Sequence, residues 1–232
     1  MKNPLNVQVL NFLADLEANN NREWFQSKKA FYEKEVKQPF EAFIGSIIHE
    51  IQSHADSRIW ITPKQAIFRL HRDTRFSGDK APYKTHLAAV ISPFGTKSKE
   101  FPGFYIQISP EKLWLGGGAY FLEKETLQRV RETIAEAGED FLALIQAPDF
   151  VQHFRSLQGE KNKRLTGDMA ELAAAMPILY NKQFYYMAEL EPEQILRPDA
   201  LQVVMRYYRA ALPLCAFLEK AVSGGEIHEK LQ

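Results

Sequence analysis

The stretch from Phe68 to His86 contains the residue types that bind anions. Its cationic side chains outnumber its carboxylates, and they are Arg69, Arg72, Arg75, Lys80 and Lys84 against Asp73 and Asp79. The whole chain of 232 residues has a formal net charge of +0 at pH 7, so this excess is local. An arginine guanidinium matches phosphate or carboxylate with two parallel hydrogen bonds, and a lysine ammonium adds a mobile point charge. The sequence therefore predicts an anion-binding site in this stretch.

The same stretch holds residues that could move a proton. The imidazole of His71 has an unperturbed pKa of about 6.5, so it can act as a general acid or base near neutral pH. Asp73 or Asp79 could orient that imidazole or hold an arginine in place. We therefore expect an enzyme that acts on a phosphorylated or carboxylated small molecule, with His71 and Asp73 as its catalytic residues.

Two other interpretations use the same residues. In the first, Asp73 and Asp79 pair with Arg72, Arg75 or Lys80 in a solvated loop, where an exposed pair contributes only ~0–1 kcal/mol. In the second, a non-catalytic module binds single-stranded nucleic acid or an acidic protein segment. The residues of that module would be the cationic stretch with Trp24, Phe76 and Tyr83. The neutral overall charge favours an anionic small molecule over nucleic acid as the partner.

Four further residues are candidates for the ligand site, namely Arg22, Tyr83, Tyr105 and Gln107. The last three could donate hydrogen bonds to a ligand if their segments lie beside the one that carries Arg69. Packing in the core or at a sheet edge is the alternative for each of them. Arg22 could line the same cleft, or it could serve only at the start of a helix.

Alternating side chains predict the strands that would position this site. Between Gln65 and His71 the alternation places Ala66, Phe68 and Leu70 on one face of a strand, so Arg69 and His71 should project together from the other. Further strands are predicted at 87–91, 104–108 and 112–121, the last with three consecutive glycines at 116–118. The short connections between them favour an antiparallel sheet.

Apolar residues at helical spacing fill both ends of the chain. Asn20 or Asn21 is a suitable N-cap for a helix, and Pro39 should lie near the start of another. Helices are also predicted at 123–137, 141–145, 149–157, 168–176 and 198–222. The chain should thus be one α+β domain over 1–232, with a central mainly antiparallel sheet (about 64–121) and helices from the N-terminal (about 4–54) and C-terminal (about 123–222) parts.

Several chemistries are excluded by the motifs they would need. Gly95-Thr96-Lys97-Ser98 lacks the earlier glycine of a phosphate-binding loop, and the single cysteine, Cys215, excludes thiolate zinc sites and internal disulfides. No metal site is predicted, and the sequence implies no particular cofactor. No apolar run approaches the ~20 residues that span a bilayer, and the N-terminus lacks the apolar segment of a signal peptide. We expect a cytoplasmic protein without a membrane partner.

Three motifs resemble those of a known family. They are Asn19-Asn20-Asn21-Arg22-Glu23-Trp24-Phe25, the stretch Phe68–Thr85, and Pro102-Gly103-Phe104-Tyr105-Ile106-Gln107-Ile108. Together they resemble the uncharacterised bacterial and fungal family called domain of unknown function 2461, over nearly the whole chain. The resemblance implies one domain and marks these positions, but it assigns no roles to them.

Overall fold

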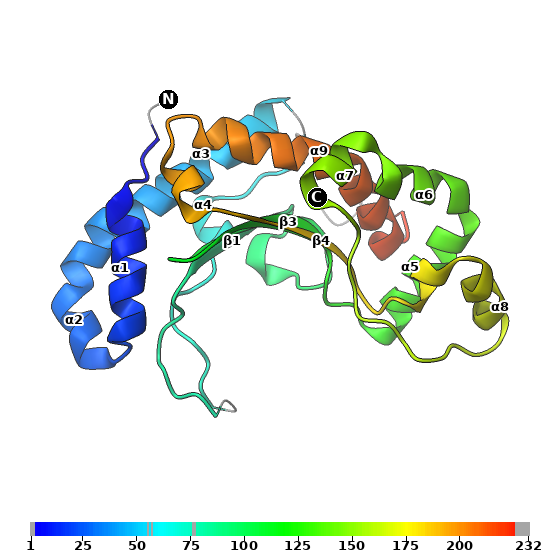
Figure 1. Ribbon diagram of the computed structural model, residues 1–232, viewed down its shortest axis with the longest axis horizontal. Coiled ribbons are helices and arrows are strands. Elements are labelled where there is room, and N and C mark those ends of the chain that lie inside the picture. The colour runs from blue at the N-terminus through cyan, green and yellow to red at the C-terminus, as the bar shows by residue number, and fades with distance from the viewer. Residues whose placement is uncertain (1–2, 55, 57, 76–77, 226–232) are drawn as a thin grey trace. The chain divides into compact units, whose positions relative to one another are not determined.

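The computed structural model describes residues 3–54, 56, 58–75 and 78–225 (Figure 1). The chain is 56% helical, with a four-stranded antiparallel sheet and helices in both its N-terminal and C-terminal parts. The strand order is β1-β2-β3-β4, and the strands are β1 (Leu87–Ile91), β2 (Gly103–Ile108), β3 (Leu113–Ala119) and β4 (Phe184–Leu190). This architecture confirms the predicted α+β class.

The chain divides into two compact units. The first contains Met1–Thr96, Tyr105–Leu115 and Glu189–Arg206, and the second contains Lys97–Phe104, Gly116–Ala188 and Tyr207–Gln232. A single domain over residues 1–232 stays a prediction. No helix within the described ranges is both long and apolar enough to cross a membrane.

The first unit begins with helices whose apolar stripes form its core. They are α1 (Val7–Ala18), α2 (Arg22–Phe31), the π-helix η1 (Tyr32–Lys37) and α3 (Gln38–His54). Phe12 and Leu13 of α1 and Phe40 and Ile44 of α3 are buried. Pro39 is the second residue of α3, as predicted. Proline cannot donate to the preceding turn, and the wider π turns of η1 lie directly before it.

Consecutive asparagines join α1 to α2. The side-chain amide of Asn19 donates to the carbonyl of Asp15 (2.9 Å) and so caps the end of α1. The side-chain oxygen of Asn21 accepts from the N–H of Trp24 (2.9 Å) and forms the N-cap of α2, which was one of the two predicted caps. Asn20, between them, has another partner, which is described with the site.

The strand predicted between Gln65 and His71 is wrong for its first two residues. Residues Pro63–Ala66 form the short helix α4, because Pro63 suits the first helical position and Thr62 and Gln65 form a capping box. The remainder is extended but pairs only through isolated antiparallel bridges, Ile67 with Ala89 and His71 with Tyr83. We call residues 67–89 the ribbon, which Figure 1 shows as a long hairpin.

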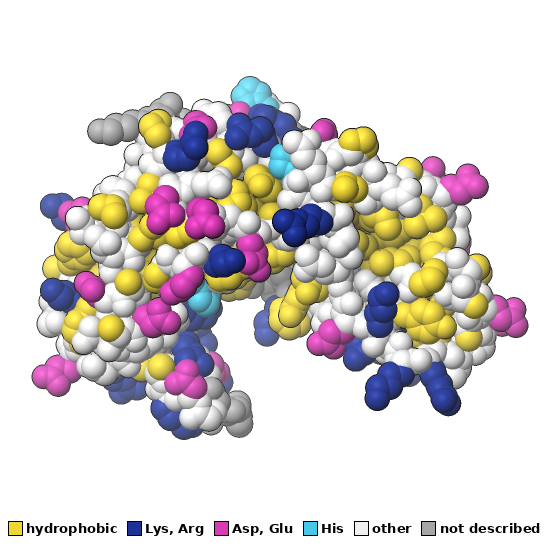
Figure 2. Space-filling view, in the orientation of Figure 1, with side chains coloured by type: hydrophobic (Ala, Val, Ile, Leu, Met, Phe, Trp, Pro, Cys, Tyr) yellow, Lys and Arg dark blue, Asp and Glu magenta, His cyan; other side chains and the backbone are white. Residues whose placement is uncertain are grey.

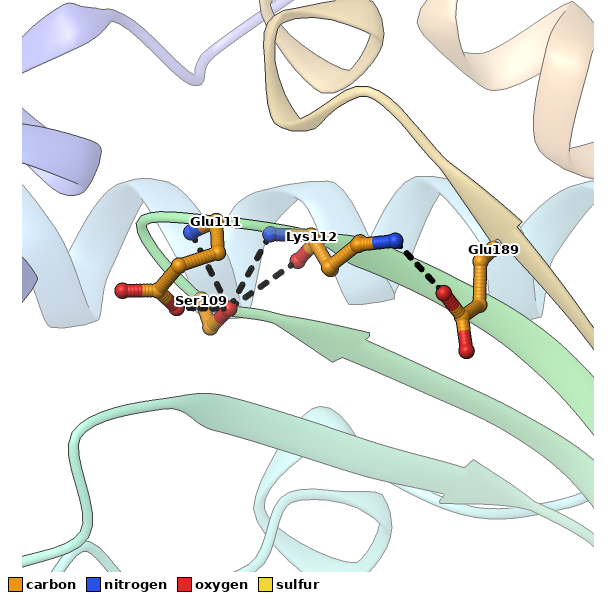
Figure 3. A network of polar contacts seen from close by, with 4 residues as sticks. All are labelled: Ser109, Glu111, Lys112 and Glu189. Atoms are coloured by element: carbon orange, nitrogen blue, oxygen red, sulfur yellow. Dashed lines mark hydrogen bonds and ion pairs between the residues drawn. The ribbon is translucent and has the colours of Figure 1, made fainter.

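The turn between β2 and β3 is closed by a backbone hydrogen bond from the N–H of Ser109 to the carbonyl of Lys112 (2.9 Å) and is organised by the Ser109 hydroxyl (Figure 3). The backbone N–H groups of Glu111 (3.3 Å) and Lys112 (3.1 Å) donate to Oγ of Ser109, which in turn donates to the Glu111 carboxylate (2.9 Å). Lys112 also pairs with Glu189 of β4 at 2.6 Å. Side-chain contacts therefore organise the turn between β2 and β3, and an ion pair connects Lys112, the residue before β3, to β4.

The second unit contains helices and parts of the sheet. Its helices include α5 (Lys124–Glu136), α6 (Gly138–Gln146), α7 (Pro148–Phe154) and α8 (Asp168–Ala175), close to the predicted ranges. The long helix α9 (Ala200–Ser223) has residues in both units and contains Pro213. Gly117 of β3 packs so closely that a Cβ atom there would lie 2.8 Å from the hydroxyl of Tyr186, which is fully buried. The predicted glycine-rich strand is thus confirmed, whereas β4 was not predicted.

Candidate functional site

The ribbon brings the two halves of the cationic stretch side by side. The N–H of Phe68 donates to the carbonyl of Ala88 (2.9 Å), and the N–H of Lys84 donates to the carbonyl of Leu70 (2.8 Å). We call residues 67–71 and 82–89 its base, and residues 72–75 and 78–81 its tip. Phe76 and Ser77 lie outside the described residues, so the expectation that Phe76 contributes an aromatic surface stays a prediction.

The base is anchored to the turn between α1 and α2. The side-chain amide of Asn20 donates to the carbonyl of Tyr83 (2.9 Å), and its oxygen accepts from the N–H of Tyr83 (3.1 Å). The Tyr83 ring is 2% exposed and stacks on Phe25 of α2, with the ring centroids 4.2 Å apart. The ring of His71 meets Tyr83 edge-on at 5.0 Å. The asparagine turn therefore sets the position of the base.

At the tip, the charged side chains pair with one another. Arg75 donates to both carboxylate oxygens of Asp73 (3.0 and 2.7 Å), and Arg72 pairs with Asp79. The hydrogen bond from Arg75 lowers the pKa of Asp73, and the one from Arg72 lowers the pKa of Asp79. Figure 2 shows basic and acidic side chains next to each other over the ribbon. The ion pairs of the structural interpretation are thus present.

Lys80 completes the tip. Its ammonium donates to the backbone carbonyl of Thr74 at 3.0 Å, which links the two sides of the hairpin. Lys80 and Arg75 are exposed and do not line the pocket described below. The described contacts of Lys80 and Arg75 are with other residues of the same hairpin.

At the base, two cations lack such partners. Among the described residues, the side chains of Arg69 and Lys84 make no ion pair or hydrogen bond. Lys84 is partly buried, with its ammonium 5.3 Å from the centroid of the Phe68 ring, in cation–π contact. Burial, followed by the charge of Arg69, lowers the pKa of Lys84. This ammonium is therefore partly desolvated, and no carboxylate of the described residues pairs with it to compensate for the lost water.

A pocket of about 610 Å³ lies in the first unit beside Lys84. Its lining combines residues of the ribbon with residues of α1 and the asparagine turn, and consists of Glu17, Asn20, Arg72, Asp73, Asp79, Ala81, Tyr83, Lys84, Thr85 and His86. Five of the predicted site residues are among them. The predicted residues Arg69, His71, Arg75, Lys80, Tyr105, Gln107 and Arg22 are not.

His86 borders the pocket and was not predicted as a site residue. Burial is the main cause that lowers the pKa of His86 to about 4, and the charges of Lys84 and Arg72 add to it. Its imidazole is therefore neutral at pH 7 and can donate or accept a hydrogen bond there. The signal in the sequence was only its nearness to Lys84 in the cationic stretch, because the chain bends at Thr85 and His86 and consecutive residues line the pocket there.

The remaining predicted residues have other partners or positions. The hydroxyl of Tyr105 donates to the side-chain oxygen of Gln107 (2.6 Å), and burial raises the pKa of Tyr105 to about 12. The Tyr105 ring lies 6.3 Å from that of Phe68, so it borders the base without lining the pocket. Arg22 is exposed as the first residue of α2.

No metal ligand set is apparent in the part of the chain that the structure describes. Groups of three or more His, Cys, Asp or Glu side chains suited to a metal ion are absent there. Cys215 is buried. The described pocket is lined by charged side chains, the hydroxyl of Thr85 and the neutral imidazole of His86.

These features define an α+β protein with a mixed-charge pocket at the base of a hairpin ribbon. Comparison with protein families matches residues 8–217 to a family described as conserved hypothetical protein (DUF2461), and the chain belongs to that family. The resemblance predicted from the three motifs is thereby confirmed. A search of the curated proteins finds no match.

Proposed function

We propose that the pocket binds the phosphate or carboxylate group of a small molecule. The observation that carries this proposal is the ammonium of Lys84, which borders the pocket, is partly buried and has no acidic partner among the described residues. An anion beside it would compensate for the water lost on burial and would favour its charged form. Binding should therefore depend on Lys84 more than on any cation of the tip.

Arg72 is the second cation of the lining and can share its charge. It binds Asp79 through Nη1, and a guanidinium has five N–H donors in a planar fork. Donors that Asp79 does not use remain for a ligand oxygen. Arg69 adds positive charge near the base, as its effect on the pKa of Lys84 indicates. Lys84 and Arg72 would form the anion-binding part of the site, and Arg69 would contribute only its charge.

Catalysis on such a ligand is the second half of the proposal. His71 lies on the base in contact with Tyr83, and His86 lies on the pocket lining. His71 with Asp73 stays the predicted proton-transfer pair. Neutral His86 would instead donate a hydrogen bond to the bound ligand. Once a substrate is known, His71→Asn should abolish turnover and retain ligand binding.

A thermal-shift screen tests anion binding directly. The ligands are inorganic phosphate, sugar phosphates, dicarboxylates and short oligonucleotides, and the proteins are the wild type, Lys84→Met and Lys80→Met. A ligand at a hundred times its Kd adds ~2.7 kcal/mol, or roughly 5–10 °C at this chain length. We expect one class of small anion to shift the wild type and Lys80→Met but not Lys84→Met.

The opposite outcomes are equally clear. An unchanged shift in Lys84→Met, or no shift by any small anion, would refute the proposal. A response to oligonucleotides alone, falling steeply with added salt, would favour the nucleic-acid module instead.

We also infer a cytoplasmic location, because a chain with one cysteine cannot use an internal disulfide. Cell fractionation would test that inference.

A further inference from the structure

Glu17 is the feature of the pocket that anion binding does not explain. It lines the same pocket as Lys84, and it is exposed. The other carboxylates of the lining are held by arginines, Asp73 by Arg75 and Asp79 by Arg72. Within the described residues, the Glu17 carboxylate makes no ion pair or hydrogen bond. The lining therefore offers one uncompensated carboxylate together with one uncompensated ammonium.

The position of Glu17 is unfavourable for the helix that carries it. Glu17 is next to the last residue of α1, and the last turn of α1 has no basic residue. The carbonyl end of a helix carries partial negative charge, so a carboxylate there is repelled. The charge at this end of α1 therefore does not favour a glutamate. The same carbonyl end and the carboxylate together favour a cation on this side of the pocket.

We propose that the ligand carries an ammonium group as well as its anionic group, as an amino acid or an aminoalkyl phosphate does. Glu17 on α1 would bind the ammonium, and Lys84 on the ribbon would bind the phosphate or carboxylate. This inference rests on the proposed function, because it uses the same pocket. The pocket volume of about 610 Å³ is within the range usual for small-molecule sites.

The neutral part of the lining is consistent with a ligand of this kind. Thr85 and His86 provide hydrogen-bonding groups without charge at pH 7, and the amide of Asn20 is committed to the backbone of Tyr83. A ligand with only an anionic end would leave Glu17 beside it as a repulsive charge. A ligand with both charges would instead have an attractive contact with Glu17.

A matched pair of ligands isolates the contribution of the ammonium. Ethyl phosphate and 2-aminoethyl phosphate differ in that group, and calorimetry would give the Kd of each for the wild type, Glu17→Gln and Glu23→Gln. Glu23 is exposed in the first turn of α2 and does not line the pocket, so its variant controls for net charge. Propionate and alanine form the corresponding pair for a carboxylate ligand.

We expect the wild type and Glu23→Gln to prefer the ammonium-bearing ligand about two- to fivefold, as a partly exposed ion pair allows. Glu17→Gln should lose this preference. The preference is the ratio of the Kd values of the two ligands in a pair. Loss of an acidic side chain strengthens the binding of both anions, and this general effect cancels in the ratio. If the preference is seen with the phosphate pair, the anionic group of the natural ligand is a phosphate. If it is seen with propionate and alanine, that group is a carboxylate.

Three results would overturn the inference. They are equal affinity of the wild type for both ligands, a preference retained in Glu17→Gln, and a preference lost in Glu23→Gln as well. In each of them, binding of ethyl phosphate or propionate that depends on Lys84 would leave the proposed anion site intact. Absence of all binding that depends on Lys84 would refute both proposals.

Discussion

The tip and the base of the ribbon carry similar side chains but differ in how their charges are compensated. At the tip, Arg72 and Arg75 pair with aspartates of the same hairpin. At the base, Lys84 is half-buried against Phe68 without a described acidic partner. The comparison teaches that a local excess of cations does not locate a ligand site by itself. Pairing inside the segment uses part of the excess, and the remainder is the part that we propose to bind a ligand.

The first prediction concerns the rigidity of the base. Tyr83→Ala removes a ring that is 2% exposed and stacked on Phe25, so we expect a loss of about 3–5 kcal/mol in the free energy of unfolding. Denaturant titration measures it. Tyr83→Phe keeps the stacked ring and should lose much less. Equal losses in the two variants would mean that the hydroxyl, not the stacking, holds the base.

The second prediction concerns the anchor of the base. Asn20→Ala deletes two hydrogen bonds to Tyr83, and we expect a loss of about 1–3 kcal/mol in the free energy of unfolding. Asn20→Asp retains the acceptor for the N–H of Tyr83 but not the donor to its carbonyl, so its loss should be smaller. Wild-type stability of Asn20→Ala would show that the base needs no anchor.

The third prediction follows from the lowered pKa of His86. In the unfolded chain the imidazole of His86 takes up a proton near pH ~6.5, whereas in the folded chain it does so only near pH 4. The unfolded state thus binds more protons between these values, and the free energy of unfolding falls as the pH falls through this window. After allowance for solvent screening, we expect a loss of about 1 kcal/mol.

Denaturant titrations at pH 7 and pH 4.5 measure this loss. His86→Asn should flatten the difference between the two pH values. His49→Asn, on an exposed position of α3, is the control for loss of an imidazole. A wild-type slope in His86→Asn would contradict the prediction.

The smallest effect is expected at the tip. Asp73→Asn breaks an exposed ion pair with Arg75, and its stability at pH 7 should be indistinguishable from the wild type in denaturation. The pairing lowers the pKa of Asp73, so whatever it contributes is present above about pH 4 and disappears as the pH falls below that. A loss as large as that of Asn20→Ala would remove the distinction between tip and base.

Sequence periodicity was sufficient for most of the fold. The apolar stripes of α1 and α3 and the alternation in β2 arise from burial of one face, so they are visible without coordinates. The strand β4 was missed, although Phe184 and Tyr186 alternate with less buried neighbours. Its second half contains Met, Ala, Glu and Leu, which are strong helix formers and mask the alternation.

The site was less predictable than the fold. Alternation along the segment predicted that Arg69 and His71 project together, and both side chains are exposed. The alternation did not predict that Arg72 pairs with Asp79, because this pairing depends on how the hairpin closes. Glu17 and Asn20 lie far from the ribbon in sequence. Only the folded chain brings them to the pocket.

The link between Asn20 and Tyr83 also has a consequence for the order of folding. It joins residues 63 positions apart, so a long loop must close before this pair can form. Closing such a loop costs entropy before the contact compensates for it, and contacts of this kind tend to slow folding. Helices α1 and α2 can form locally, whereas the pocket waits for the ribbon to reach the asparagine turn. If the pocket binds a ligand as proposed, that binding would report the docking of the ribbon onto Asn20, and could time this step in a refolding experiment.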